Sequence, residues 1–123
     1  MRQVRVVLVD AQEAFMHALV AVVDATRGFV VVGQAATGEE SLTLTDELNP
    51  GLVLMDVNLP GIDGVEATRR LRERRTPPIV ILLSTYDEDA GELFVSQSGA
   101  TAYVTKSALS PQRLSQIWSM SQG

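Results

Sequence analysis

Five short runs rich in apolar and β-branched residues recur along the chain. They cover residues 4–9, 29–33, 52–56, 79–83 and 102–105. Between and after these runs, apolar residues are spaced three or four positions apart, as at Phe15, Leu19 and Val22. Runs of this length are typical of buried strands, and the wider spacing is typical of amphipathic helices. The pattern therefore predicts five strands that alternate with five helices.

Capping residues mark where three of the helices begin. Thr37 and Asp63 are each followed three positions later by an acid, which is the spacing of a capping box. In such a box Glu40 would reach back to the start of the helix that Thr37 caps. Ser110 stands before Pro111, which is favoured in the first turn of a helix. We expect helices to begin at these positions.

The fourth helix is predicted to be the weakest. Asp87 can cap it, and it would run to about residue 98. Gly91 would lie inside this helix, where glycine costs about 1 kcal/mol relative to alanine. Its apolar residues are few, chiefly Leu93, Phe94 and Val95. We therefore expect it to be the least stable of the five helices.

Strands that alternate with helices favour a parallel sheet covered on both faces, because helical crossovers join parallel neighbours. The predicted fold is a doubly wound α/β fold of flavodoxin-like type, with strand order 2-1-3-4-5. In such a sheet ligands bind beyond the carboxyl ends of the strands, here between the first and third strands. Asp10 and Asp56 stand at the ends of those two strands.

Composition narrows the function classes. The 123 residues suffice for one domain, and the absence of cysteine excludes disulfides and thiolate metal sites. His17 is the single histidine, which disfavours zinc. The net charge is −5, and the one basic cluster, at residues 69–75, fits a solvated helix face, so this domain alone is not expected to bind DNA. No apolar run approaches a membrane span, and we expect a cytoplasmic protein without membrane association.

Four chemically distinctive residues follow predicted strands and should converge on one rim: Asp10, Asp56, Ser84 and Lys106. Two neighbouring carboxylates repel each other unless a cation lies nearby, and Mg²⁺ is a suitable ion. Lys106 adds a positive charge and Ser84 a hydroxyl donor. Phosphoryl transfer needs an in-line nucleophile and cations at the phosphoryl oxygens. The set therefore indicates phosphoryl transfer with Asp56 as the nucleophile.

In this order and spacing, the residues resemble the response-regulator receiver domain (CheY-like) over essentially the whole chain. Residues 59–64 are similar to the family's loop after the phosphoacceptor, and residues 99–106 to its fifth-strand signature. The resemblance implies Asp56 as phosphoacceptor, Ser84 as switch hydroxyl, Tyr103 as aromatic switch and Lys106 as the family's lysine. It also implies a signalling switch, phosphorylated by a sensor histidine kinase, and not an enzyme acting on other substrates.

The resemblance further implies a Mg²⁺ site made by Asp10, Asp56 and the main-chain carbonyl of Asn58. It implies that Asn58 and Tyr86 tune the lifetime of the phosphoryl group. The sequence as a whole, including Ser107 where many receivers have proline, is most similar to the NarL/FixJ subfamily, whose members usually carry a LuxR-type helix-turn-helix after a linker. We therefore expect residues 1–123 to be the receiver of a longer transcription regulator, which would bind DNA through an absent C-terminal domain. The resemblance leaves open whether the chain forms a homodimer.

One residue departs from the family. Receivers usually end the first strand with two adjacent acids, whereas this chain has Asp10 followed by Ala11. Gln12 or Glu13 could supply the missing ligand, or Asp10 could coordinate the ion directly. We predict weakened Mg²⁺ binding. The alternative is an atypical receiver that works as a phosphorylation-independent binding or dimerisation module.

Two enzyme classes with related folds are disfavoured by local chemistry. A haloacid-dehalogenase-like phosphatase would need a second acid at position 58, where this chain has asparagine. A flavodoxin would hold the FMN phosphate in a loop after the first strand, and the acidic sequence of residues 10–13 would repel that phosphate.

Overall fold

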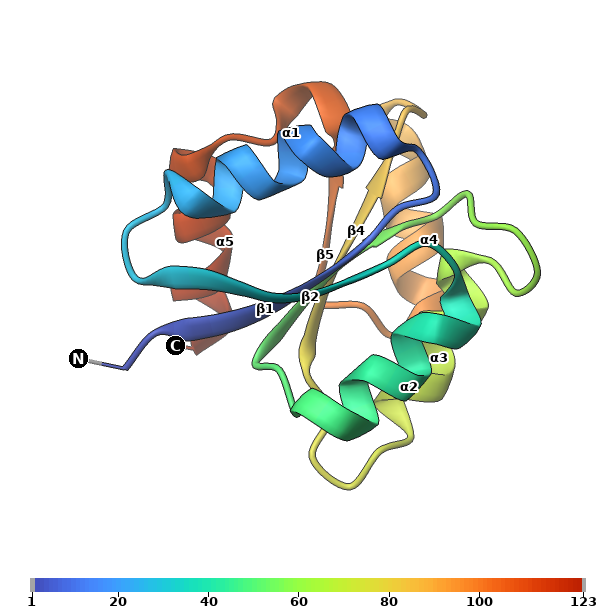
Figure 1. The fold of residues 1–123 in the computed structure, drawn as a ribbon. Helices are drawn as coiled ribbons and strands as arrows, with labels where there is room; N and C mark the ends of the chain where they lie inside the picture. The colour runs from blue at the N-terminus through green and yellow to red at the C-terminus, as the bar shows by residue number, and fades with distance from the viewer. Residues whose placement is uncertain (1, 123) are drawn as a thin grey trace.

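The computed structural model describes residues 2–122 and contains the five strands and five helices that the sequence predicts (Figure 1). The strands are β1 (Val4–Val9), β2 (Phe29–Ala35), β3 (Leu52–Asp56), β4 (Ile79–Ser84) and β5 (Ala102–Thr105). The helices are α1 (Glu13–Asp24), α2 (Gly38–Leu48), α3 (Gly64–Arg72), α4 (Gly91–Ser98) and α5 (Pro111–Gln122). Two short 3₁₀ turns are η1 (Glu88–Ala90) and η2 (Lys106–Ala108).

The strands form one parallel sheet in the order β2-β1-β3-β4-β5, which confirms the predicted topology. Strand β3 is central and buried along its whole length, as expected from its unbroken apolar run. Strand β2 lies at an edge and is two residues longer than its apolar run, because Gln34 and Ala35 still pair with β1. The polar side chain of Gln34 is exposed to solvent.

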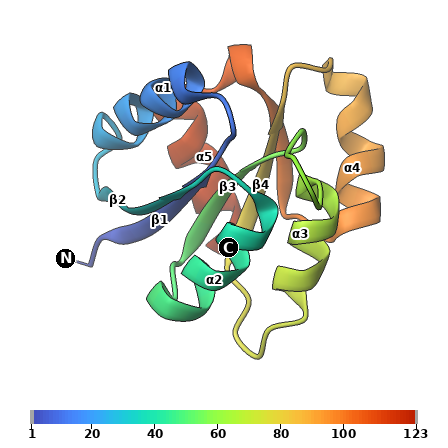
Figure 2. The same ribbon diagram turned by 45° about the vertical axis from the view of Figure 1, so that its right-hand side comes forward.

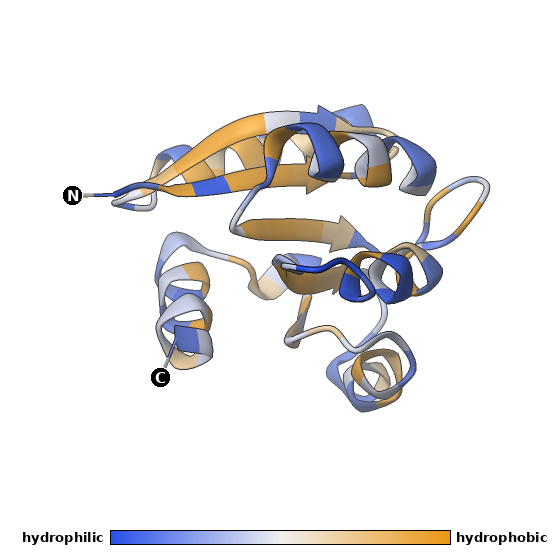
Figure 3. Cartoon of the chain, turned by 90° about the horizontal axis from the view of Figure 1, so that it is seen from below, coloured by the Kyte–Doolittle hydropathy of each residue, from blue (hydrophilic) through white to orange (hydrophobic). Residues whose placement is uncertain are grey.

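Helices cover both faces of the sheet, with α1 and α5 on one face and α2, α3 and α4 on the other (Figure 2). Each face has its own apolar cluster. Leu8, Leu19 and Leu114 belong to the cluster under α1 and α5, and Met55 and Leu71 to the opposite one. The strands are apolar over most of their length, whereas each helix is apolar only on part of its surface (Figure 3). The two helix layers thus enclose the sheet between two apolar clusters.

The predicted helix caps are confirmed at three positions. The Thr37 hydroxyl accepts a hydrogen bond from the backbone N–H of Glu40 at 3.0 Å, and the Asp63 carboxylate accepts one from Glu66 at 2.8 Å. The Ser110 hydroxyl accepts one at 3.1 Å from the N–H three residues later. The return bond of Glu40 goes to the N–H of Ala36 at 2.7 Å, one residue before Thr37.

The expectations for the fourth helix need correction. The segment after Asp87 forms the 3₁₀ turn η1 first, and the Asp87 side chain makes no cap hydrogen bond. Gly91 begins α4 instead of lying in its interior. Leu93 is 59% exposed, so it does not contribute to an apolar stripe facing the sheet. The packing of Gly91, described below, explains why a glycine stands there.

The structure also places Trp118, His17 and part of the basic cluster at residues 69–75. Trp118 packs edge-to-face on Phe29, with ring centroids 6.1 Å apart, and His17 is exposed on α1. In the basic cluster, Arg74 pairs with Asp46 at 2.9 Å, and the Arg69 guanidinium donates to the carbonyl of Gln97 at 2.9 Å. None of the helices within residues 2–122 is both long enough and apolar enough to cross a membrane.

Candidate functional site

Four strands deliver the predicted residues to one rim of the sheet. Asp10 directly follows β1, Asp56 ends β3, Ser84 ends β4 and Lys106 directly follows β5. All four strands are parallel, so their carboxyl ends lie at the same edge. The convergence predicted from the sequence is therefore present.

Lys106 connects the two carboxylates across this rim. Its Nζ lies 2.8 Å from Oδ2 of Asp10 and 3.3 Å from Oδ2 of Asp56. The three side chains are 9%, 0% and 4% exposed, respectively. Water screens these charges weakly because so little of them is exposed, so each pair interacts more strongly than a surface ion pair would.

Backbone N–H groups hold the other oxygen of each carboxylate. The N–H of Gln12 donates to Oδ1 of Asp10 at 2.8 Å, and the N–H of Asn58 donates to Oδ1 of Asp56 at 3.2 Å. Oδ2 of Asp10 has no hydrogen-bond partner, because its contact with Lys106 has the distance of an ion pair but not the alignment of a hydrogen bond. This buried oxygen retains the capacity to accept another ligand.

Asp56 is held at a raised pKa. Burial is the largest cause, followed by repulsion from the Asp10 carboxylate. The Lys106 ammonium and the hydrogen bond from the Asn58 N–H act in the opposite direction and lower the pKa. Two carboxylates against one ammonium leave a negative charge uncompensated among these three groups. The site would therefore attract a further cation.

Ser84 and Tyr103 both hold the loop that follows β4. The fully buried Ser84 hydroxyl accepts a hydrogen bond from the N–H of Tyr86 at 2.9 Å. The Tyr103 hydroxyl lies 3.1 Å from the carbonyl oxygens of Tyr86 and Asp87 and donates to them. Two residues that the resemblance assigns to one switch thus contact the same loop from two strands.

Aromatic rings extend this contact onto α4. The ring of Phe94 lies 5.9 Å from that of Tyr86 and 5.7 Å from that of Tyr103, measured between centroids. Gly91 packs directly under Tyr103, since a Cβ at position 91 would overlap the ring. The position of Tyr103 therefore depends on residues of α4 that the sequence pattern did not connect with the site.

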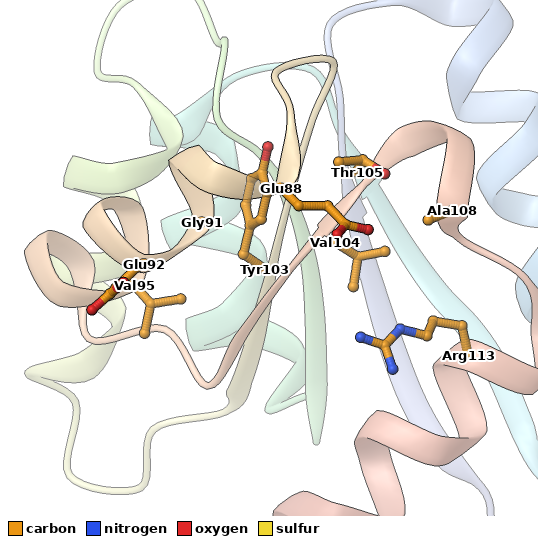
Figure 4. A pocket seen from close by; sticks show the side chains of 9 residues that line it. All are labelled: Glu88, Gly91, Glu92, Val95, Tyr103, Val104, Thr105, Ala108 and Arg113. Carbon is orange, nitrogen blue, oxygen red and sulfur yellow. The ribbon is translucent and has the colours of Figure 1, made fainter.

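Two cavities open on this side of the molecule. One of about 630 Å³ adjoins the site and is lined by both Ser84 and Lys106, with Phe15 and Tyr86 as its aromatic walls. The second, of about 400 Å³, lies over β5 between α4 and α5 (Figure 4). Its lining residues are Glu88, Gly91, Glu92, Val95, Tyr103, Val104, Thr105, Ala108 and Arg113. Tyr103 thus reaches from the loop after β4 to this second cavity.

The remaining predicted site residues lie around Asp10 and Asp56. Asn58 and Tyr86 are exposed, and Tyr86 is 52% exposed, so both can be reached from solvent. Ala11 and Glu13 are exposed and line a separate cavity of about 440 Å³ together with Asp10. Within residues 2–122 no three His, Cys, Asp or Glu side chains are grouped to hold a metal.

A Mg²⁺ ion still fits the oxygen donors that are present. Mg²⁺ in proteins is commonly held by one or two carboxylates, with water filling the other positions. Asp10 and Asp56 provide two buried carboxylates, and Oδ2 of Asp10 accepts no hydrogen bond. The donor set is one carboxylate smaller than it would be with an acid at position 11.

Two residues at the start of α1 contact Lys106. Gln12, considered above as a replacement for the missing acid, accepts a hydrogen bond from Lys106 Nζ through Oε1 at 3.2 Å. The ring of Phe15 lies under the same Nζ, 4.3 Å from it to the ring centroid. Phe15 was predicted only as an apolar helix residue, and no sequence signal distinguishes it from the other apolar positions of α1.

Comparison with known proteins supports the family that the sequence resembles. The profile of the response regulator receiver domain matches residues 6–118. Over 105 residues the chain is 40% identical to the response regulator GacA of Pseudomonas viridiflava, covering 85% of this chain and 49% of GacA. It is 32% identical over 120 residues to the transcriptional regulatory protein LiaR of Bacillus subtilis, covering 98% of this chain and 57% of LiaR. The chain thus spans about half the length of these curated relatives.

Solved structures agree in fold. The signal receiver domain of the putative response regulator NarL from Mycobacterium tuberculosis superposes with a TM-score of 0.86 at 27% identity, covering 100% of this chain and 99% of that one. The similarity to the NarL/FixJ subfamily expected from the sequence is therefore confirmed. The chain belongs to the response regulator receiver family of two-component systems, among relatives that regulate transcription.

Proposed function

We propose that this domain accepts a phosphoryl group on Asp56 from a sensor histidine kinase and switches a downstream output. The observation that carries the proposal is the contact of Lys106 with Asp56 at 3.3 Å at the buried rim of the sheet. A carboxylate that faces a fixed ammonium group can receive a phosphoryl group whose charge the ammonium then compensates.

The proposed reaction is a direct transfer between two nucleophiles. A carboxylate oxygen of Asp56 attacks the phosphorus atom of a phosphohistidine, and an acyl phosphate forms as the P–N bond breaks. The imidazole leaves with the electron pair of that bond and takes a proton from solvent. Lys106 and the Ser84 hydroxyl would contact the phosphoryl oxygens. The domain is in this sense a signalling switch that promotes only its own phosphorylation and dephosphorylation.

Asp10, Asp56 and the main-chain carbonyl of Asn58 would hold the Mg²⁺ ion. The bound ion would compensate the negative charge that develops on the phosphoryl oxygens. Because Ala11 supplies no ligand, we propose a lower Mg²⁺ affinity than an acid at that position would give. The exposed side chains of Asn58 and Tyr86 would restrict the access of water to the phosphoryl group and so set its lifetime. A ligand role for Glu13 stays a prediction.

The change that phosphorylation of Asp56 causes would be transmitted through the loop after β4. Attraction of the Ser84 hydroxyl to the phosphoryl group would break its hydrogen bond with the N–H of Tyr86. Tyr103, which donates to carbonyls of the same loop, would then change position against α4. The surface shown in Figure 4 would differ between the two states.

The proposal is tested by activating the domain chemically. The isotope-labelled domain is incubated with acetyl phosphate, or with beryllofluoride, across a Mg²⁺ series that reaches tens of millimolar. Backbone NMR shifts of Ser84 and Tyr103 report the switch, and intact-protein mass spectrometry reports phosphorylation. We expect Mg²⁺-dependent shifts in the wild type and none in Asp56→Asn. Identical behaviour of the two proteins at every Mg²⁺ concentration would exclude the switch.

A second candidate function is supported by Ala11 and by the small donor set. The domain would then be a phosphorylation-independent module that binds a partner, or a second copy of itself, through the surface over β5. In that case Asp56→Asn would leave partner binding or dimerisation unchanged, whereas substitutions at Val95 or Arg113, which line the cavity in Figure 4, would weaken it. Analytical ultracentrifugation of these variants separates the two functions.

The proposed output is transcription. LiaR is a transcriptional regulatory protein, and the matched region covers 57% of its length. A C-terminal helix-turn-helix domain joined to residues 1–123 would provide DNA binding in the cytoplasm. The receiver itself would control that domain without contacting DNA.

A further inference from the structure

The amino group of Lys106 is surrounded by four groups. The Asp10 and Asp56 carboxylates contribute two oxygens, at 2.8 and 3.3 Å. Gln12 contributes a third oxygen at 3.2 Å, and the ring of Phe15 lies 4.3 Å away. Two of these oxygens, Asp56 Oδ2 and Gln12 Oε1, accept hydrogen bonds from the ammonium, whereas Asp10 Oδ2 forms an ion pair with it without hydrogen-bond alignment.

The four groups divide into two kinds. The carboxylates are the groups that the proposed function assigns to a divalent cation. The side chains of Gln12, the residue before α1, and of Phe15, in its first turn, are uncharged and contact the Lys106 ammonium. A hydrogen bond from an ammonium to an amide oxygen and a cation–π contact each stabilise the position of the ammonium. Their combined effect is to keep Lys106 between the carboxylates.

We propose that Gln12 and Phe15 are positioning residues that hold Lys106 against Asp10 and Asp56 and thereby lower the affinity of this site for divalent cations. The inference rests on the proposed function, because it concerns the metal site assigned there. It adds a second cause of weak Mg²⁺ binding, independent of the missing acid at position 11.

The argument is one of competition. A cation that takes Oδ2 of Asp10 must share or displace the ammonium that now lies 2.8 Å from this oxygen. When Lys106 moves, its contacts with Gln12 and Phe15 weaken. The lost contact energy makes metal binding less favourable. A ligand binds more tightly when an interaction that stabilises only the ligand-free state is removed. Removal of Gln12 Oε1 should therefore strengthen metal binding.

The test measures Mg²⁺ affinity of the unphosphorylated domain by NMR, through the amide shifts of Asp10, Ala11 and Asn58. The variant Gln12→Met keeps the length of the side chain but removes the acceptor oxygen. Phe15→Leu keeps an apolar side chain but removes the ring. Gln112→Met, at an exposed position of α5, is the matched control. The ¹³Cε signal of Lys106 is followed in the same titrations.

We expect Gln12→Met to bind Mg²⁺ about threefold to tenfold more tightly, the range that follows from losing one hydrogen bond in the competing state. Phe15→Leu should bind about twofold to fivefold more tightly, and the control should match the wild type. The Lys106 ¹³Cε signal should shift with Mg²⁺ in the wild type. Unchanged or weaker binding by Gln12→Met would overturn the inference; weaker binding would mean that Gln12 itself ligates the ion.

The outcome is separable from that of the proposed function. Phosphorylation of Asp56 is measured in the same proteins with acetyl phosphate at saturating Mg²⁺. A phosphorylated wild type with an unchanged affinity in Gln12→Met defeats only this inference. Tighter binding by Gln12→Met in a domain that acetyl phosphate fails to modify supports this inference and defeats the proposed function. Absence of Mg²⁺ binding in the wild type and in both α1 variants overturns this inference.

Discussion

Gly91 and Tyr103 are in direct contact, and the ring of Tyr103 occupies the space that a side chain at position 91 would need. The contact joins the first residue of α4 to the middle of β5. Glycine at a helix position ordinarily costs stability relative to alanine. Here the absence of a Cβ lets the Tyr103 ring lie against α4 while its hydroxyl reaches the loop after β4.

Gly91→Ala should destabilise the domain by about 1–3 kcal/mol, because the new methyl group overpacks the contact with Tyr103. The free energy of unfolding is measured by urea denaturation. Gly51→Ala is the matched control, since a Cβ there would lie at an ordinary 3.6 Å from Trp118. In a Tyr103→Ala background the Gly91→Ala substitution should become neutral or stabilising. A stabilising Gly91→Ala in the wild-type background would contradict the assigned contact.

Tyr103→Phe should loosen the loop after β4 while the fold is retained. The substitution keeps the ring against Phe94 and removes only the hydroxyl that donates to Tyr86 and Asp87. We expect a loss of about 1 kcal/mol in the free energy of unfolding and faster amide exchange over residues 86–90. Tyr86→Phe is the control, because its exposed ring also packs on Phe94 and should show neither effect. Equal exchange in both variants would argue against the Tyr103 anchor.

The sequence predicted those parts of the site that depend on strand order. The apolar run before Asp56 specified a buried strand, and parallel topology then required Asp56 and Lys106 to end at one rim. Such an inference needs only the period of the apolar pattern and the rule that parallel strands share their carboxyl edge. The capping residue Thr37 was predictable for a similar reason, since its partner is three residues away.

Contacts between distant elements were not predictable in this way. The contact of Phe15 with Lys106 depends on how α1 is rotated after the turn at Ala11 and Gln12, which an apolar period leaves open. Gly91 illustrates the same limit. Helix propensity depends only on a residue's own helix, whereas Gly91 is needed because of its contact with Tyr103, which belongs to β5. The 3₁₀ turn before Gly91 moved the start of α4, which the cap signal at Asp87 placed too early.

Asp56→Asn should raise stability at neutral pH. Burial and the Asp10 charge hold the pKa of Asp56 above its ordinary value of 3.8 in the folded state. The folded protein therefore binds the Asp56 proton more tightly than the unfolded chain. Ionisation of Asp56 thus lowers stability as the pH rises from about the ordinary value through the folded pKa, and the whole cost is present above that pKa.

The neutral amide that Asp56→Asn introduces avoids this cost. Without added metal, we expect the variant to be more stable than the wild type near pH 7, with the difference vanishing as the pH falls below the ordinary value. Urea denaturation at a series of pH values measures the difference. Glu47→Gln, which changes an exposed carboxylate on α2, is the charge-matched control. A difference independent of pH would show that ionisation of Asp56 is not its cause.

Ala11→Asp should strengthen Mg²⁺ binding on the order of tenfold, because it adds a third carboxylate next to two that are already buried together. Position 11 is exposed and adjoins Asp10, so the new side chain needs no rearrangement of the core. In the absence of metal the added charge should lower stability by repelling Asp10 and Asp56. Saturating Mg²⁺ should reverse that loss, so the melting temperature of Ala11→Asp should depend more steeply on Mg²⁺ than that of the wild type.

The control is Ala11→Asn, whose side chain has the shape of aspartate without its charge. It should show a smaller gain in Mg²⁺ affinity and no destabilisation without metal. If Ala11→Asp and the wild type bind Mg²⁺ equally, the proposed weakening of the site by the missing acid is wrong.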